Sequence, residues 1–234
     1  KFPLRALTVV TGVSGAGKTS LIASTLAPAV AAVLGSETAS PLPFDTLDGA
    51  EHLEQVVPID GRPLGRSARS NPATVTRIFD AIRQVFATTS EARVQGYTPS
   101  RFSFNAPGGR CEVCDGLGEL ETPAHLLTDL RVPCHGCRGR RYNEATLRIR
   151  YKGASIADVL AMSVDEALAF FEHHKKIHRV LTVLHDVGLG YLPLGRSALT
   201  LSGGESQRIK LARELGRARR GARGRSWAWS LAVG

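Results

Sequence analysis

A glycine-rich stretch near the start of the chain, Gly12-Val13-Ser14-Gly15-Ala16-Gly17-Lys18-Thr19, decides the fold class. It fits the pattern G-x-x-x-x-G-K-[ST], in which backbone N–H groups surround phosphates because glycines leave no Cβ atoms in the way. An apolar run over 4–10 precedes the loop and predicts a buried strand. Residues 19–26 predict a helix that Pro28 disturbs or kinks. Strand, loop and helix in this order predict an α/β fold of the P-loop type.

The residues of this loop have separate expected roles in holding a nucleotide. The ammonium of Lys18 reaches the β- and γ-phosphates, and the hydroxyl of Thr19 is placed to ligate Mg²⁺. A helix N-terminus directly after the loop favours an anion. A glycine-rich turn that matches by chance is the alternative, which the flanking strand and helix oppose. The expected ATP-binding residues are Gly12, Gly15, Ala16, Gly17, Lys18, Thr19 and Ser20.

All four cysteines of the chain fall in one stretch, as Cys111-x-x-Cys114 and, after nineteen residues, Cys134-x-x-Cys137. Each C-x-x-C turn can aim two thiolates at one point, and two such turns complete the closed tetrahedral site of structural zinc. Disulfides are the alternative, but an ATP-binding chain normally works in a reducing cytosol. His135 lies inside the second turn and is expected to face solvent, because four cysteines already fill the coordination shell.

Arginines and aromatic side chains are interleaved around the cysteines. Guanidinium groups beside flat rings suit a nucleic-acid surface, with a solvated basic surface as the alternative. For Phe102 and Phe104, which alternate with Ser103, we favour a strand that faces a small hydrophobic core. The expected DNA-contacting residues are Arg101, Arg110, Arg138, Arg140 and Arg141.

The composition, with 43% hydrophobic and 22% charged residues, is typical of a soluble globular protein. No apolar stretch approaches the ~20 residues that span a bilayer, and no secretory signal opens the sequence. The formal net charge of +9 points to a polyanionic partner. Five of those charges are arginines between positions 217 and 225, so the remainder carries about +4. These properties favour a cytoplasmic chain without a membrane segment.

Caps and apolar periodicity predict helices in the rest of the chain. Asn71-Pro72 is a cap followed by proline, and Ser155-x-x-Asp158 and Ser163-x-x-Glu166 have the pattern of capping boxes. Residues 53–59 are expected to form a strand. Apolar side chains recur at helical spacing at Val75, Ile78, Phe79, Ile82 and Phe86, at Leu168 and Phe171, and at Ile177, Val180, Leu181, Leu184 and Val187, before Gly188 and Gly190.

A second anion site is expected at residues 201–205, which open a helix through Ile209, Leu211, Ala212 and Leu215. A serine hydroxyl, glycine amides and the helix dipole together favour a phosphate, although a purely structural helix cap is the alternative. The phosphate loop upstream and this element resemble ATP-binding cassette ATPases, where such a signature caps the γ-phosphate held by the opposite nucleotide domain. The expected signature residues are Leu201, Ser202, Gly203, Gly204 and Glu205.

Several motifs narrow this resemblance. They are RSARSNPAT at 66–74, RFSFN at 101–105, GGRCEVCDGLG at 108–118, VPC at 132–134, RYN at 141–143 and LSGGE at 201–205. Through them the chain resembles the C-terminal half of the UvrA family, the damage-recognition subunits of bacterial nucleotide excision repair. The resemblance covers nearly everything from Leu4 to Leu215.

The resemblance implies an α/β P-loop ATPase domain of the cassette type, incomplete here and interrupted by a helical signature subdomain and a zinc-binding module. We expect the P-loop core at 1–92, the zinc module at 93–152, the helical subdomain at 153–200, the signature helix at 201–216 and an aberrant arginine-rich tail at 217–234. The resemblance also implies ATP, Mg²⁺ and Zn²⁺ as cofactors, and a part in DNA excision during the SOS response. The implied partners are damaged duplex DNA and a UvrB-like protein, with dimerisation of the full-length protein.

The chain departs from the family pattern in three places. Asp60-Gly61-Arg62-Pro63 stands where family members carry Asp-Gln-Ser-Pro, so the glutamine that senses Mg²⁺ and the attacking water is missing. After the signature helix the family has an Asp-Glu pair and a switch histidine, whereas Glu214 is the last acid here and 217–234 resembles no part of the family, as a truncated or frame-shifted end would. The start lacks the strand and aromatic residue that meet adenine. We therefore expect weak nucleotide binding with poor or no hydrolysis, and we assign no catalytic residue.

Three other interpretations stay open. A UvrA-like paralogue that confers resistance to DNA-binding drugs would use the same cassette chemistry, and the altered position 61 favours a divergent member. A non-enzymatic zinc module is the second, since residues 111–118 also resemble the cysteine-rich repeat of DnaJ chaperones, although this leaves the phosphate loop unexplained. A non-functional gene remnant is the third, which the aberrant tail supports.

Overall fold

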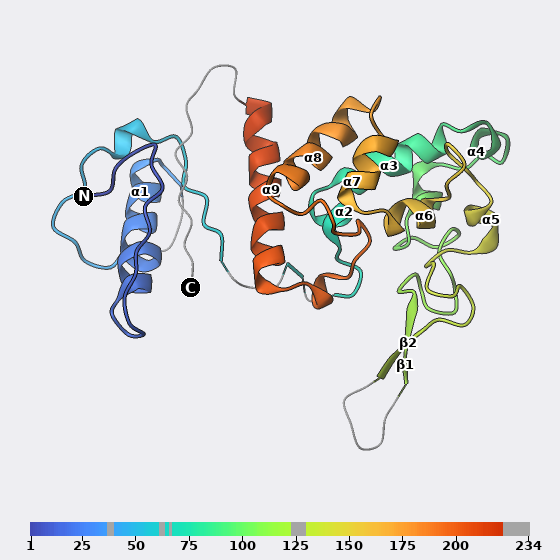
Figure 1. Ribbon diagram of the computed structural model, residues 1–234, viewed down its shortest axis with the longest axis horizontal. Helices are drawn as coiled ribbons and strands as arrows, with labels where there is room; N and C mark the ends of the chain where they lie inside the picture. The colour runs from blue at the N-terminus through green and yellow to red at the C-terminus, as the bar shows by residue number, and fades with distance from the viewer. Residues whose placement is uncertain (37–39, 61–63, 66, 123–129, 222–234) are drawn as a thin grey trace. The chain divides into compact units, whose positions relative to one another are not determined.

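The computed structural model describes residues 1–36, 40–60, 64–65, 67–122 and 130–221 of the chain (Figure 1). The chain forms two compact units, which we call the N-terminal unit, Lys1–Arg62, and the larger unit, Pro63–Gly216. Three features of the sequence analysis lie outside the described residues. They are Gly61, where the family has glutamine, the first residue of the 66–74 motif, and most of the tail.

A continuous helical run follows the phosphate loop of the N-terminal unit. A π-helical segment, η1 (Ser20–Leu26), continues into α1 (Ala27–Val33). Pro28 has no N–H to donate to the carbonyl of Ser24, four residues earlier, and that carbonyl instead accepts from the backbone N–H of Leu42 at 2.9 Å. The helix predicted over 19–26 is confirmed, with η1 covering Ser20–Leu26, and Pro28 lies in the first turn of α1 rather than at the end of a helix.

Both strands predicted for the N-terminal unit are wrong for the described structure. Residues 4–10 and 53–59 are extended or turn segments without ladder pairing. Leu7 and Val9 are 85% and 70% exposed. A strand of a buried parallel sheet needs partners for its backbone groups on its neighbours, and no such partners lie beside these segments in the described residues. The small core of this unit consists of Ala29, Val30, Ala31, Ala50 and Ile59, with a 3-10 turn, η2, at Ala50–His52.

The larger unit is mainly helical. Its first half contains α2 (Pro72–Val75), α3 (Ile78–Ala87), α4 (Ser90–Val94) and the 3-10 turn η3 (Pro99–Phe102). An antiparallel hairpin follows, β1 (Glu119–Thr122) with β2 (Leu130–Pro133), in which Glu119 lies opposite Pro133. The second half contains α5 (Glu144–Leu147), α6 (Ile156–Ala161), α7 (Val164–Phe170), α8 (Lys175–Asp186), the turn η4 (Ala198–Thr200) and α9 (Gly203–Gly221). In Figure 1 the hairpin projects away from the helices of this unit.

The predicted caps begin the predicted helices. Asn71 caps α2, because its side-chain oxygen accepts from the N–H of Thr74 at 2.9 Å while the threonine hydroxyl accepts from the N–H of Asn71. The boxes at Ser155 and Ser163 cap α6 and α7 in the same reciprocal way. One helix was expected over 72–86, but Arg77 adopts a positive φ of 61° and divides it into α2 and α3.

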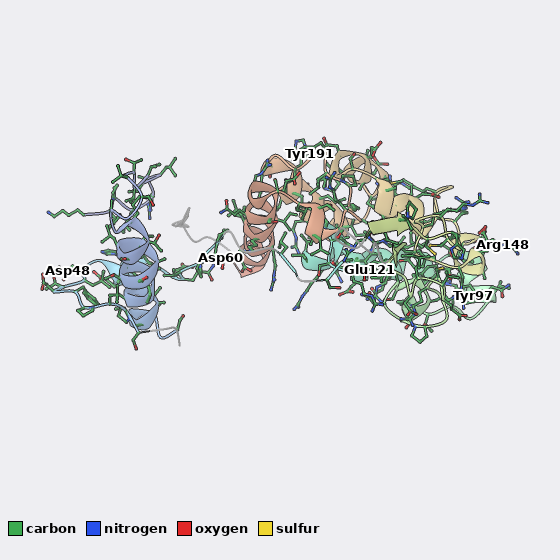
Figure 2. All side chains as sticks on the ribbon, turned by 90° about the horizontal axis from the view of Figure 1, so that it is seen from below. Asp48, Asp60, Tyr97, Glu121, Arg148 and Tyr191 are labelled. Atoms are coloured by element: carbon green, nitrogen blue, oxygen red, sulfur yellow. The ribbon has the colours of Figure 1, made fainter. Side chains whose placement is uncertain are left out.

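One hydrophobic core holds the larger unit together. The periodic side chains of α3 and α8 enter it, among them Ile82, Phe86 and Leu181, which have no exposed surface. Phe86 meets Phe102 with ring centroids 5.6 Å apart. Figure 2 shows the side chains of the described residues as sticks. Within the described part of the chain, no helix has the length and apolar character needed to cross a membrane.

Candidate nucleotide and metal sites

The phosphate loop is closed on itself by its lysine. Lys18 Nζ donates to the carbonyl oxygens of Gly12, at 2.8 Å, and Val13, at 2.9 Å. Gly15 and Gly17 have φ values of 82° and 80°, a left-handed conformation that favours glycine. The backbone therefore turns sharply just before the helix, and the ammonium group lies against the loop.

The residues after the lysine lie at a helix N-terminus. Leu21 donates its N–H to the carbonyl of Gly17 at 2.9 Å, so the amides before it are at the open end of the helical run. Thr19 and Ser20 are exposed and Lys18 is half-buried. An exposed threonine hydroxyl and an exposed turn of amides have the chemistry to meet a phosphate and its magnesium ion.

The signature residues form the N-terminal cap of α9. Ser202 and Glu205 make a reciprocal box, in which Ser202 Oγ accepts from the N–H of Glu205 at 3.2 Å and Glu205 Oε2 accepts from the N–H of Ser202 at 2.8 Å. Gly203 and Gly204 are exposed, with open space where a Cβ would lie. The Ser202 hydroxyl also donates to the Glu205 carboxylate, so it would have to turn from that carboxylate to donate to a phosphate oxygen.

The carboxylate of Glu205 stays ionised beside this cap. The backbone N–H of Ser202 and then the hydroxyl of Tyr191, 2.8 Å from Glu205 Oε1, hold the pKa of Glu205 below its usual range. Leu201 is half-buried and packs against the hydrophobic core of the larger unit. The signature thus combines a half-buried leucine that packs on the core, an exposed pair of glycines and a carboxylate held by hydrogen bonds.

The four cysteines converge on one buried point. Their sulfur atoms all lie within 4.8 Å of one another, with Cys111–Cys134 at 3.9 Å and Cys114–Cys137 at 3.6 Å. Zinc–sulfur bonds of about 2.3 Å in a tetrahedron separate the sulfurs by roughly 3.8 Å, whereas a disulfide brings them to about 2.05 Å. The donor set and its spacing therefore fit a single zinc ion and do not fit disulfides.

Backbone close to the sulfurs keeps this arrangement. Gly116 has a φ of 78°, and a Cβ there would come within 1.9 Å of the carbonyl oxygen of Phe104. The N–H of Gly118 donates to Cys114 Sγ at 3.2 Å. Burial raises the pKa of Cys137 to about 12, so a bound divalent cation is what would stabilise its thiolate. His135 is exposed, as predicted.

The aromatic residues of the zinc region belong to the core. Phe102 and Phe104 have no exposed surface, which confirms that they face a hydrophobic core. The predicted strand is wrong, because Phe102 ends η3 and Phe104 lies in a turn. Tyr142 is buried and donates its hydroxyl to the carbonyl of Phe102 at 2.9 Å, and burial raises its pKa. None of these three rings is open to stack on a base.

Two of the five candidate DNA-contacting arginines lie against aromatic rings of the unit. Arg101 Nε donates to Thr146 Oγ1 at 3.0 Å, and its guanidinium lies 4.3 Å from the ring centroid of Tyr97. Arg141 lies 5.1 Å from the ring of Phe104, and burial lowers its pKa. Their guanidinium groups thus already stabilise the packing around the cysteines.

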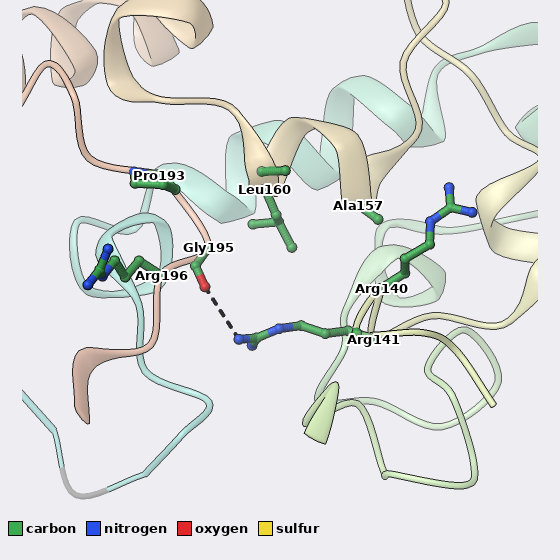
Figure 3. Close-up of a pocket in the computed structure, with 9 residues that line it drawn as sticks. Arg140, Arg141, Ala157, Leu160, Pro193, Gly195 and Arg196 are labelled. Carbon is green, nitrogen blue, oxygen red and sulfur yellow. Dashed lines mark hydrogen bonds between the residues drawn. The ribbon is translucent and has the colours of Figure 1, made fainter. Parts of the chain in front are cut away.

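The other three arginines are more accessible. Arg110 makes an ion pair with Asp115 at 2.7 Å, Arg140 lies 3.8 Å from Asp158, and Arg138 is exposed. Arg140 also lines a pocket of about 380 Å³, which lies between Gly139–Arg141, α6 and the segment 193–196. Figure 3 shows Arg141 reaching across it to the carbonyl of Gly195, at 3.3 Å, while Arg140 points away.

The sequence gives no direct sign of two residues beside the signature, Tyr191 and Arg208. Tyr191 contacts Glu205, and Arg208 Nη1 donates to the carbonyl of Gly188 at 2.8 Å. The pattern Ser202-x-x-Glu205 is itself a capping-box signal that would have located the helix start. The contacts of Tyr191 and Arg208 depend on the fold of 187–192 and have no local pattern.

The chain is similar to curated UvrA proteins over most of its length. It is 54% identical over 215 residues to UvrABC system protein A of Bacillus subtilis (strain 168), which is 92% of this chain and 22% of that protein. It is 52% identical over 216 residues to UvrABC system protein A of Pseudomonas aeruginosa, again 92% of this chain and 23% of the relative. The chain matches a segment of UvrA. It spans less than a quarter of the length of these relatives.

A solved structure agrees with the match to UvrA. The crystal structure of UvrA2 from Deinococcus radiodurans superposes with a TM-score of 0.83 at 46% identity, covering 99% of this chain and 27% of that one. No family model matches the chain. The resemblance to UvrA predicted from the motifs is confirmed, and the mixed helical and hairpin architecture is that of a UvrA segment. The predicted domain boundaries and site residues stay predictions.

Proposed function

We propose that this chain is the ATP- and zinc-binding segment of a UvrA-like DNA-damage-recognition subunit of bacterial nucleotide excision repair. The observation that carries the proposal is the loop at 12–19, where Lys18 lies against glycine-bearing backbone at the start of a helix. Its setting in a chain 54% identical to UvrABC system protein A of Bacillus subtilis supports a repair ATPase over other P-loop proteins.

The nucleotide is held by the loop amides, by Lys18 and by Thr19. The ammonium of Lys18 now donates to the carbonyls of Gly12 and Val13. If phosphate oxygens replaced these acceptors, the ammonium would neutralise the β- and γ-phosphates. A magnesium ion on the Thr19 hydroxyl supplies charge neutralisation at the phosphates. The cassette core that this requires is of the ATP-binding cassette type, interrupted by the signature subdomain and the zinc module.

The signature acts on a nucleotide held by another cassette. Ser202 would turn its hydroxyl from the Glu205 carboxylate to the terminal phosphate of that nucleotide, and Gly203 and Gly204 would donate their exposed amides to it. ATP would then join two cassettes, and the full-length protein would dimerise.

The zinc module is structural and carries part of a DNA surface. Four thiolates close the coordination shell and leave no open position for chemistry. Arg138 is exposed and the pairs of Arg110 and Arg140 are partly open to solvent, so these three arginines are the best candidates for phosphate contacts with a damaged duplex. A UvrB-like protein is the expected partner, and the reducing cytoplasm is the compartment where the thiolates persist.

We also infer that the 234-residue chain by itself hydrolyses ATP poorly. Phosphoryl transfer to water needs carboxylates that hold the metal and the nucleophile. The stretch after the signature helix offers no Asp-Glu pair, and glycine stands at position 61 in place of glutamine. The chain would therefore bind nucleotide without efficient turnover.

Calorimetry with MgATP tests the nucleotide site. The chain should take up ATP in a magnesium-dependent way, and Lys18→Ala should reduce the affinity at least about 100-fold, because a charge-assisted contact to the phosphates is lost. Lys1→Ala, in the same unit and with the same loss of charge, is the matched control and should bind as the wild type does. Uptake that Lys18→Ala leaves unchanged, or no uptake by folded protein, would contradict the proposal.

A further inference from the structure

The first turn of α9 is held to the segment after α8 by a chain of hydrogen bonds. Tyr191 donates its hydroxyl to Glu205 Oε1 at 2.8 Å. The other oxygen of that carboxylate accepts from the N–H of Ser202 at 2.8 Å, and Ser202 Oγ accepts from the N–H of Glu205 at 3.2 Å. The Tyr191 hydroxyl therefore orients the Glu205 carboxylate, and this carboxylate in turn holds the backbone of Ser202.

A second contact lies one helical turn further along α9. Arg208 Nη1 donates to the carbonyl oxygens of Gly188, at 2.8 Å, and Val187, at 3.4 Å, the two residues that directly follow α8. Its Nε donates to the carbonyl of Gly204 at 3.4 Å, inside the signature. A single guanidinium thus joins the end of one helix to the start of the other.

Neither side chain is needed to build the core between these helices. Ile209 and Ala212 of α9 are buried, and Leu189 and Leu192 anchor the segment after α8 with no exposed surface. Tyr191 is 60% exposed and lies at the edge of the unit in Figure 2. Because its ring is mostly in water, its contact with Glu205 contributes little to stability and mainly sets an orientation.

The charge of Glu205 gives this orientation a consequence. An ionised carboxylate three residues after Ser202 would repel a phosphate if it turned toward the exposed amides of Gly203 and Gly204. Its two oxygens are instead engaged by Tyr191 and by the backbone of Ser202. The contact therefore holds the carboxylate, and its negative charge, in one orientation.

We propose that Tyr191 and Arg208 are positioning residues, which hold the signature at Ser202–Gly204 in the geometry that receives the terminal phosphate of a nucleotide on another cassette. This inference rests on the function proposed for the signature. It adds a coupling between two parts of the unit. Any movement of the segment 187–191 relative to α9 would change the orientation of the Ser202 side chain and the hydrogen bonds of the Glu205 carboxylate. The nucleotide interface and the helical subdomain would thereby report on each other.

The first test measures the signature in the 234-residue chain. Tyr191→Phe removes one hydroxyl and Arg208→Lys keeps the charge but loses the forked contact. The matched controls are Tyr97→Phe and Arg179→Lys, which alter no hydrogen bond or ion pair found in the described structure. By NMR, Tyr191→Phe should raise the pKa of Glu205, and both variants should speed exchange of the Glu205 amide about threefold or more. An unchanged pKa and unchanged exchange rates would overturn the inference.

The second test measures turnover in a full-length protein that carries the matching stretch of this chain within UvrABC system protein A of Bacillus subtilis. Ser202→Ala should lower the kcat for ATP about tenfold or more. Tyr191→Phe and Arg208→Lys should lower kcat about threefold to tenfold with KM and Tm nearly unchanged, while both control variants behave as the wild type.

The outcomes separate the two claims. If Ser202→Ala leaves kcat unchanged, the function proposed for the signature fails. If Ser202→Ala slows turnover but Tyr191→Phe and Arg208→Lys do not, the positioning role fails and the function stands. A fall in kcat that only follows a fall in Tm would also overturn the positioning role, since general destabilisation would then explain it.

Discussion

The two units of the chain use apolar residues to different effect. In the larger unit Phe86, Phe102, Phe104 and Leu181 have no exposed surface, whereas in the N-terminal unit Leu7 is 85% exposed. The helices of the larger unit each bury one face against partners present in the same chain. The apolar run before the phosphate loop has the composition of a strand buried on both faces, which requires neighbouring strands. Apolar content therefore becomes a core only where the complementary surfaces are present.

The zinc site gives the largest expected effect within this comparison. Removing zinc with a chelator, or changing Cys134 to serine, should unfold the region around the four thiols, since structural zinc contributes about 10 kcal/mol or more to such modules. Metal analysis should give one zinc per folded chain, and thermal melting should show the loss. His135→Ala, exposed between two of the ligands, is the control and should keep both zinc and Tm. Far less than one zinc per chain would contradict the assignment.

A pair of core substitutions compares the units directly. Phe86→Ala should destabilise the larger unit by about 3–5 kcal/mol, because it leaves a cavity against Phe102. Val30→Ala, in the small core of the N-terminal unit, should cost only about 1 kcal/mol, since few buried neighbours surround it. Hydrogen exchange followed by mass spectrometry can resolve the two units in one denaturant series. Equal losses across both units would show that they unfold together and would remove the distinction.

Helix capping offers a smaller and local effect. Asn71→Ala should destabilise the larger unit by about 1–2 kcal/mol, because the N–H of Thr74 then loses its side-chain acceptor and keeps only the carbonyl of Asn71, at 3.1 Å. Asn71→Ser keeps a side-chain oxygen at the same place and should recover most of the loss. Chemical denaturation with an unchanged m-value is the measurement. A serine variant as unstable as the alanine variant would show that packing, and not the cap, explains the effect.

The same contrast explains which features could be predicted from the sequence. The caps at Asn71, Ser155 and Ser163 and the thiol cluster were predictable, because each depends on residues within a few positions or on a fixed ligand spacing. The break at Arg77 was not, since a positive φ at a non-glycine residue is set by the tertiary packing around it. The strands predicted at 4–10 and 53–59 failed because a strand is defined by its neighbours.

The candidate sites also divide into local motifs, which the sequence predicts, and contacts that depend on the tertiary fold. The loop at 12–19 and the cysteines are local motifs, and their geometry follows from glycine conformations and sulfur spacing. The arginines near the cysteines share one residue type and one region, yet Arg141 is held against Phe104 while Arg138 is exposed. The presence of a charged residue in the sequence does not predict whether its side chain packs inside the protein or points into solvent. The contacts of Tyr191 and Arg208 join segments 14 and 20 residues apart and depend on where α8 ends.

A surface ion pair provides the smallest expected effect and shows how little the larger unit depends on exposed charge. His185 Nδ1 lies 2.7 Å from Asp165 Oδ1, and the hydrogen bond and then the charge of Asp165 raise the pKa of His185. Because the folded pKa is raised, the pair contributes stability that is complete below the ordinary histidine pKa of about 6.5 and is lost as pH rises through the folded value. Both side chains are more than half exposed, so the contribution is small.

NMR titration of the His185 imidazole tests whether the pair with Asp165 forms in solution. Asp165→Asn should return the pKa of His185 toward its ordinary value and remove the pH dependence of Tm just above pH 6.5, while Asp80→Asn, on a different helix, should leave both unchanged. A titration of His185 that is the same in Asp165→Asn would show that the pair does not form in solution. A large fall in stability in that variant would instead mean that exposed charge, and not only the buried core, distinguishes the larger unit from the N-terminal unit.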